Sequence, residues 1–243
     1  MVAQLAAASV AAAADLAGTL IVTSAHKAGR APLRYCVAAG AGFMLATAFV
    51  RMLPESASDP HAFFYVLAGY FGVHLFEHTV APHFHFGEEV HGDLVVKRSV
   101  GYLALFGLSV HTLFDGVAIA AGFMVGGSLG SLLFIAVLLH KLPEGFTIGS
   151  IMLASGRSVR AAMAASATLG AATIVGALLT TLIARDHVGP ALALSAGVTI
   201  YVAASDLIPE VNREGGPSAA WTVFAGLLFF AAADWFLARH GAQ

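Results

Sequence analysis

The sequence carries little charge for its length. Only 11% of its 243 residues are Asp, Glu, Lys or Arg, and 58% are hydrophobic, whereas soluble domains usually carry about a quarter charged residues. The formal net charge of -2 and the lack of a basic patch give no indication of a nucleic-acid partner. A chain this apolar is expected to be a polytopic membrane protein in contact with the lipid bilayer.

Cysteine and the common catalytic motifs are also scarce. Cys36 is the single cysteine, which rules out an intrachain disulfide and a thiolate-rich metal site. No GxxxxGK[ST] motif occurs, so ATP-driven pumping has no basis in the sequence, and no HExxH motif occurs either. We expect no prosthetic group and no enzymatic activity.

Long apolar runs dominate what is present. A helix needs roughly 20 apolar residues to cross the hydrocarbon core. The short breaks between runs are polar or contain Gly and Pro, and no second soluble domain fits, so residues 1–243 are expected to form one transmembrane domain with an all-α fold. The eight expected spans lie at about 4–24, 33–54, 62–81, 99–123, 127–153, 159–184, 189–210 and 218–238.

The basic residues predict the orientation. The first span lacks a basic n-region, and Lys27, Arg30 and Arg34 come after it, which favours a retained helix over a cleaved signal peptide. Lys and Arg concentrate in alternate connections, and these connections are cytoplasmic if both termini face outside. The long connection 82–98 is then cytoplasmic.

Two pairs of ionisable residues lie inside expected spans. His111 and Asp115 are four residues apart in the fourth span, and His140 and Glu144 are four residues apart in the fifth. Residues at i and i+4 share one helix face, and ionisable groups at membrane depth indicate function. Two such helices side by side offer two nitrogens and two carboxylates, a plausible shell for Zn(II), Fe(II), Mn(II) or Co(II).

Proline marks three of these spans. Pro143 lies between His140 and Glu144, where its missing N–H is expected to kink the helix inside the site. The triplets Leu53-Pro54-Glu55 and Ile208-Pro209-Glu210 close the second and seventh spans. This match favours inverted repeats in a 3+2+3 arrangement, with spans four and five between them.

The motifs GFMLATAFVRMLPES, HTLFDGVAIA, LLHKLPEGFTIG and ASDLIPEV together resemble the ZIP (Zrt/Irt-like protein) family of divalent metal transporters. The resemblance implies eight spans with both termini outside. It also implies a transport site built from the fourth- and fifth-span pairs, with a second-span residue nearby that Met44 matches. Asp206 matches an acid of the exit route, and Glu210 shares its helix face.

The chain departs from family members that hold two metals. Where those members commonly carry Asn and an acid, this sequence has Thr112 and Lys141, and the sixth span carries no acid. The hypothesis is therefore a single metal site in which the Lys141 ammonium takes the place of a second ion. The alternative is that Lys141 extends to the membrane interface.

Other polar residues allow two interpretations each. The loop histidines His83, His85 and His91 either collect metal at the exit or belong to an ordinary solvated loop. Asp15 and Asp234 are isolated acids in the first and eighth spans, for which we expect interhelical hydrogen bonding, with a role in transport as the alternative.

The resulting function is uptake of a divalent transition metal into the cytoplasm by alternating access. Zinc is the first choice of substrate, with iron, manganese and cadmium as alternatives. Two other classes stay open, an intramembrane metal-dependent hydrolase and a metal-sensing membrane protein. The Ala- and Gly-rich composition and the lack of a glycosylation sequon at the sole Asn, Asn212, favour a prokaryotic source and the bacterial inner membrane. Homodimer formation is left open.

Overall fold

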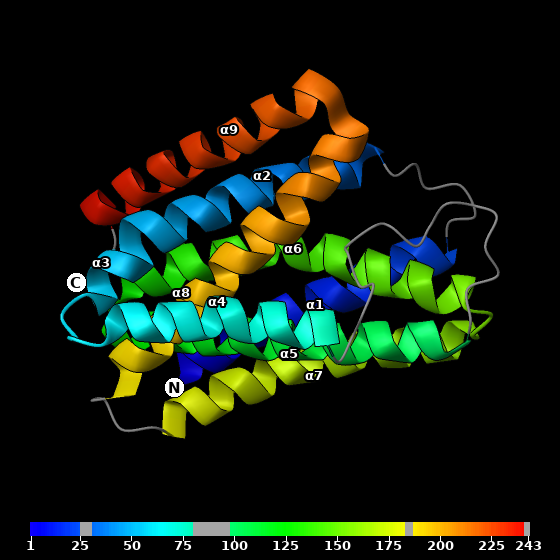
Figure 1. Ribbon diagram of the computed structural model, residues 1–243, viewed down its shortest axis with the longest axis horizontal. Helices are drawn as coiled ribbons and strands as arrows, with labels where there is room; N and C mark the ends of the chain where they lie inside the picture. Colours follow the sequence, from blue (N-terminus) through cyan, green and yellow to red (C-terminus); the bar gives the residue numbers. More distant parts are fainter. Residues whose placement is uncertain (25–30, 80–97, 183–186, 241–243) are drawn as a thin grey trace.

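The structure is a computed structural model that describes residues 1–24, 31–79, 98–182 and 187–240. Every secondary-structure element in these ranges is helical, as Figure 1 shows. The elements are α1 (Val2–Ser24), α2 (Ala31–Thr47), η1 (Ala48–Met52), α3 (Leu53–Ser56), α4 (Ala62–Thr79), α5 (Arg98–Val125), α6 (Gly127–Ala154), α7 (Val159–Leu182), α8 (Val188–Tyr201), η4 (Val202–Leu207) and α9 (Ile208–His240).

These helices confirm the expected class, an all-helical polytopic membrane protein. Each of the eight expected spans falls on a helical segment, and seven segments in the described ranges are long and apolar enough to cross a membrane. The helix α4, which corresponds to the expected span 62–81, is not among the seven, since its last turns carry His74, Glu77 and His78.

One expected boundary differs from the structure. The stretch NREGGP between the last two expected spans was expected to be a loop, but α9 runs from Ile208 to His240 with a single non-helical residue, Gly216. Gly216 has φ 54° and ψ −155°, a conformation that L side chains rarely adopt. The chain turns sharply there, and Pro217 starts the second half of α9 (Figure 1).

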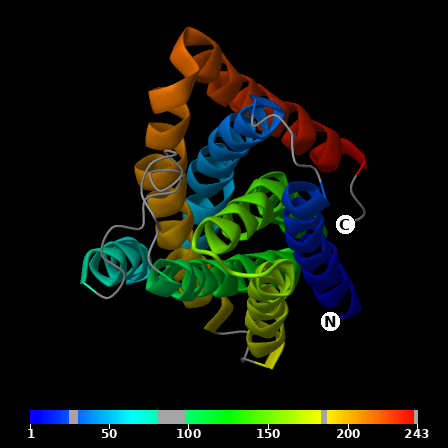
Figure 2. The same ribbon diagram turned by 90° about the vertical axis from the view of Figure 1, so that its right-hand side faces the viewer.

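The helices pack in two groups, one formed by α1, α5, α6 and α7 and the other by α2, α4, α8 and α9. Figure 2 shows α5 and α6 in the middle of the bundle. In the first group, α1 packs on α6 and α7, while α5 packs on α6 and α7; in the second, α2 packs on α9 and α4 packs on α8. The groups meet where α2 contacts α6 and α5 contacts α8. Both termini lie at one end of the bundle (Figure 1).

Reciprocal glycines join the helices within each group. In each of four helix pairs, a Cβ added to a glycine of either helix would collide with a backbone carbonyl of the other, so the backbones themselves are in contact. These glycines are Gly18 and Gly145 (α1 and α6), Gly116 and Gly176 (α5 and α7), Gly69 and Gly197 (α4 and α8), and Gly42 and Gly226 (α2 and α9).

The two Pro-Glu triplets have the same local structure. A π-helical turn precedes each one, η1 before Pro54 and η4 before Pro209. The Leu53 N–H donates to the Ala48 carbonyl and the Ile208 N–H donates to the Ala203 carbonyl, five residues back in both cases. A proline ring crowds the carbonyl four residues earlier, and a wider turn gives that carbonyl room. By contrast, α6 continues as one α-helix through Pro143.

Candidate metal centre

Four predicted ligands converge between α5 and α6. His111 and Asp115 come from α5, and His140 and Glu144 come from α6. One ligand atom of each lies within 4.8 Å of the other three. All four side chains are buried, with exposed fractions of 5%, 4%, 3% and 0% in that order. The i,i+4 spacing on two adjacent helices therefore brings two imidazoles and two carboxylates to one point.

Asp115 Oδ2 lies close to both imidazoles. It is 3.4 Å from His111 Nε2 and 3.3 Å from His140 Nε2. Two ligand atoms that each lie about 2.0–2.1 Å from a tetrahedral zinc ion are separated by about 3.3–3.4 Å. The separations between these nitrogens and the carboxylate oxygen therefore suit a shared tetrahedral cation.

The backbone orients one of the imidazoles. His140 Nδ1 lies 2.9 Å from the Ala136 carbonyl oxygen, which can only accept, so Nδ1 carries the proton. In the neutral ring, Nε2 then presents a lone pair towards the Asp115 carboxylate. A cation between these two acceptors satisfies both, and a hydrogen bond from the other ring nitrogen is the usual way to orient a metal-binding histidine.

Lys141 lies inside the site. Its side chain is fully buried, and its Nζ donates to Glu144 Oε2 at 2.6 Å and to Thr112 Oγ1 at 3.2 Å. The same Nζ lies 2.9 Å from Asp115 Oδ2. The Thr112 hydroxyl in turn donates to Glu144 Oε1 at 2.5 Å. The alternative that Lys141 extends to the membrane interface is therefore wrong.

The isolated acids both have cationic neighbours. Asp15 Oδ2 lies 3.9 Å from Lys141 Nζ, and Asp234 Oδ1 lies 3.2 Å from Arg51 Nε. Interhelical hydrogen bonding was expected for both acids, but among the described residues neither Asp15 oxygen nor Asp234 Oδ1 accepts a hydrogen bond. The contact of Asp234 is instead an ion pair between α9 and η1. Sequence reasoning did not place Asp15 beside the metal site, although an acid and a lysine both buried at membrane depth are natural partners.

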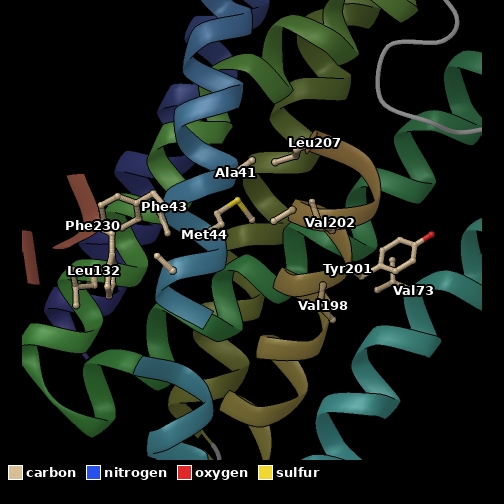
Figure 3. Packing of buried hydrophobic residues seen from close by; sticks show 13 residues of the cluster. Ala41, Phe43, Met44, Val73, Leu132, Val198, Tyr201, Val202, Leu207 and Phe230 are labelled. Atoms are coloured by element: carbon tan, nitrogen blue, oxygen red, sulfur yellow. The ribbon is translucent and has the colours of Figure 1, made fainter. Parts of the chain in front are cut away.

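The remaining predicted residues lie outside the four-residue group or outside the described residues. Met44 is 1% exposed and packs in an apolar cluster with Ala41, Val202 and Leu207, as Figure 3 shows. Asp206, in η4, is 7% exposed. The side chain of Glu210 and the loop residues His83, His85 and His91 lie outside the described residues.

Fold and site together define a helical membrane protein with a buried His and carboxylate group suited to a divalent metal. The family model described as ZIP Zinc transporter matches residues 83–234, more than half of the chain. The chain therefore belongs to the ZIP zinc transporter family. This family is one of transporters and not of enzymes, so the alternative of an intramembrane hydrolase is not pursued.

Curated relatives agree with this assignment. Zinc transporter zipt-7.1 of Caenorhabditis briggsae is 34% identical over 134 residues, which cover 53% of this chain and 34% of the relative. Human zinc transporter SLC39A7 is 33% identical over 141 residues, covering 54% of this chain and 30% of the relative. Human zinc transporter ZIP10 is 28% identical over 121 residues, covering 49% and 15%.

The matched region spans about a third or less of the length of these relatives. All three come from animals, so they give no support to the expected prokaryotic source or to the bacterial inner membrane.

Proposed function

We propose that this protein carries divalent transition-metal ions, zinc foremost, across a membrane. The observation that carries the proposal is the convergence of His111, Asp115, His140 and Glu144, all buried between two helices of a membrane protein. Two imidazoles and two carboxylates suit zinc, and they also suit iron, manganese and cadmium less selectively. Membership of the ZIP zinc transporter family and the names of the curated relatives support zinc as the substrate.

The site holds a single ion in this proposal, with Lys141 in place of a second. The fully buried ammonium lies 2.6 Å from Glu144 Oε2 and 2.9 Å from Asp115 Oδ2. A second divalent ion that bridged these two carboxylates would need the space that the ammonium fills. Lys141 thus supplies a tethered positive charge without being a ligand.

The proposed topology has eight spans in a 3+2+3 arrangement, with α4 as the third span and both termini outside. The termini at one end of the bundle agree with an even number of spans (Figure 1). The matched π-helical turns before Pro54 and Pro209 support inverted repeats around α5 and α6. The loop 82–98 is then cytoplasmic, and transport is directed into the cytoplasm.

Alternating access is supported by the packing of the two helix groups. Backbone contact at reciprocal glycines joins helix pairs within each group, whereas side chains such as those around Met44 fill the boundary between α2, η4 and α6. Side-chain contacts can be exchanged more readily than glycine-mediated backbone contacts. The candidate ligands all belong to the group that contains α5 and α6.

Several predicted residues keep proposed roles along the route. Met44 borders the site from α2, and Asp206 with Glu210 lines the exit. The loop histidines His83, His85 and His91 collect metal at the cytoplasmic face.

Transport by purified protein in proteoliposomes tests the function. A divalent-sensitive dye is enclosed, and Zn(II), Fe(II), Mn(II) or Cd(II) is added outside. We expect influx with the wild type and with Ser150→Ala, a control on α6 whose hydroxyl donates to the Phe146 carbonyl within the same helix. We expect loss of influx with His140→Ala and with Glu144→Ala. Equal influx in all four proteins, or none in any, would refute the proposal.

A further inference from the structure

Asp15 is a buried carboxylate that has no role in the transport site as proposed above. It lies in α1 and its side chain is fully buried. Within the described part of the chain, neither carboxylate oxygen accepts a hydrogen bond. Buried ionised groups without partners are costly, so such a group usually has a function or a partner in another state. The nearest cation is Lys141 Nζ, at 3.9 Å from Asp15 Oδ2.

Close helix contact fixes Asp15 at this position. Gly145 of α6 lies against the backbone of Asp15, where a Cβ would collide with the Asp15 carbonyl. One turn further along α1, the Thr19 hydroxyl donates to the Gly145 carbonyl at 2.5 Å. The Asp15 carboxylate is therefore held beside the turn of α6 that carries Lys141 and Glu144.

The net charge of the metal-occupied site indicates a role for Asp15. With neutral imidazoles, a divalent ion is balanced by Asp115 and Glu144 alone. The Lys141 ammonium then adds one positive charge in a buried, low-dielectric site, a costly arrangement. A third carboxylate at Asp15 makes the occupied site neutral as a whole.

We propose that Asp15 is the counter-ion that receives the Lys141 ammonium when a metal ion occupies the site. The bound ion draws the oxygens of Asp115 and Glu144 towards itself and repels the ammonium. Lys141 has a flexible four-carbon stem, and an approach of about 1 Å brings Nζ within hydrogen-bond reach of Asp15 Oδ2. Asp15 is thus a positioning residue that acts through Lys141, an inference that rests on the proposed function.

Zinc binding by the purified full chain in detergent micelles tests this inference, measured by equilibrium dialysis and metal analysis. Asp15→Asn leaves the occupied site with an excess positive charge, and we expect zinc affinity to fall about 10- to 100-fold, the range typical of residues that support metal ligands. Lys141→Met removes the ammonium that repels the bound ion, and we expect zinc affinity to rise. The double variant Asp15→Asn/Lys141→Met restores the balance, and its affinity is expected to return to within a few fold of the wild type.

Thr19→Val is the matched control, because it alters the same α1–α6 contact without changing charge. Wild-type affinity in Asp15→Asn would overturn the inference. So would a double variant as weak as Asp15→Asn, or an equal loss in Thr19→Val, because either result would indicate a packing effect. If Asp15→Asn alone does not fold, recovery of folding and zinc binding in the double variant supports the inference, and failure of both overturns it.

His140→Ala separates this inference from the proposed function. Wild-type binding that His140→Ala abolishes, combined with an unaffected Asp15→Asn, leaves the transport site standing and removes only the role of Asp15. Wild-type protein that binds no zinc, or binds it independently of His140, refutes the proposed function and the role of Asp15 with it.

Discussion

At the scale of single residues, Lys141 determines which groups of the site are paired with a cation. Its ammonium contacts Glu144 and Asp115 and donates a hydrogen bond to the Thr112 hydroxyl, so each carboxylate has an oxygen paired with this cation. Thr112 also donates to the other Glu144 oxygen. Thr112 and Lys141, the two positions where family members with two metals carry Asn and an acid, therefore act together. Each of them contacts one oxygen of Glu144.

The number of bound metals tests this arrangement. We expect one zinc per chain in the wild type, because the ammonium fills the space between the two carboxylates. Lys141→Glu replaces the cation with a ligand and is expected to raise the count to two zinc ions per chain. Metal analysis after dialysis measures both values.

Lys141→Met is the control for that experiment, since it removes the cation without supplying a ligand. We expect it to retain one zinc per chain. Two zinc ions in the wild type, or anomalous scattering from two metals between α5 and α6, would show that Lys141 does not replace an ion.

At the scale of helices, glycine position determines which pairs pack closely. Gly69 and Gly72 both lie in α4, nearly one turn apart, but their surroundings differ. A Cβ on Gly69 would collide with the Leu194 carbonyl of α8, whereas a Cβ on Gly72 would meet nothing within 4 Å. The pair therefore offers a matched comparison within one helix.

Thermal unfolding in detergent measures the difference. Gly69→Ala forces α4 away from α8, and overpacking of this kind costs about 1–3 kcal/mol, so we expect a lower melting temperature. Gly72→Ala is expected to leave stability unchanged or raise it slightly, since alanine is the better helix former. Equal effects of the two substitutions would show that the α4–α8 contact is not governed by glycine.

The helices and the convergence of the four candidate ligands could be predicted from the sequence because both depend on local pattern. Apolar run length defines a span, and the i,i+4 spacing aligns His111 with Asp115 and His140 with Glu144. The proximity of Asp15 to Lys141 could not be predicted in this way. It depends on the close approach of α1 and α6 at Gly145, a contact between segments far apart in the chain.

The end of the seventh span shows a second limit. Gly and Pro in NREGGP are typical of a loop, yet only Gly216 leaves the helical conformation. One residue with positive φ is enough to turn the chain, and the residues before it continue the helix. Composition therefore predicted where the chain turns, but it could not predict that a single residue of the segment would be non-helical.

At the scale of the whole molecule, the direction of transport depends on orientation in the membrane. The connection after α3 lies at the same end of the bundle as both termini, and the connection between α6 and α7 lies at the opposite end (Figure 1). Cys36 is the single cysteine, so a Cys36→Ser background lets one introduced cysteine report on one side. Ser58 and Ser158 are exposed positions in these two connections.

We expect a membrane-impermeant maleimide to label Ser58→Cys in intact cells, and to label Ser158→Cys only after the membrane is permeabilised. The reason is the bias of Lys and Arg towards connections on the cytoplasmic side, which places the connection between α6 and α7 inside. Total labelling after permeabilisation controls for reactivity at each position. The opposite labelling pattern would show that the protein has the reverse orientation in the membrane, so that the proposed transport would be export and not uptake. Labelling of both positions from outside would contradict the eight-span topology.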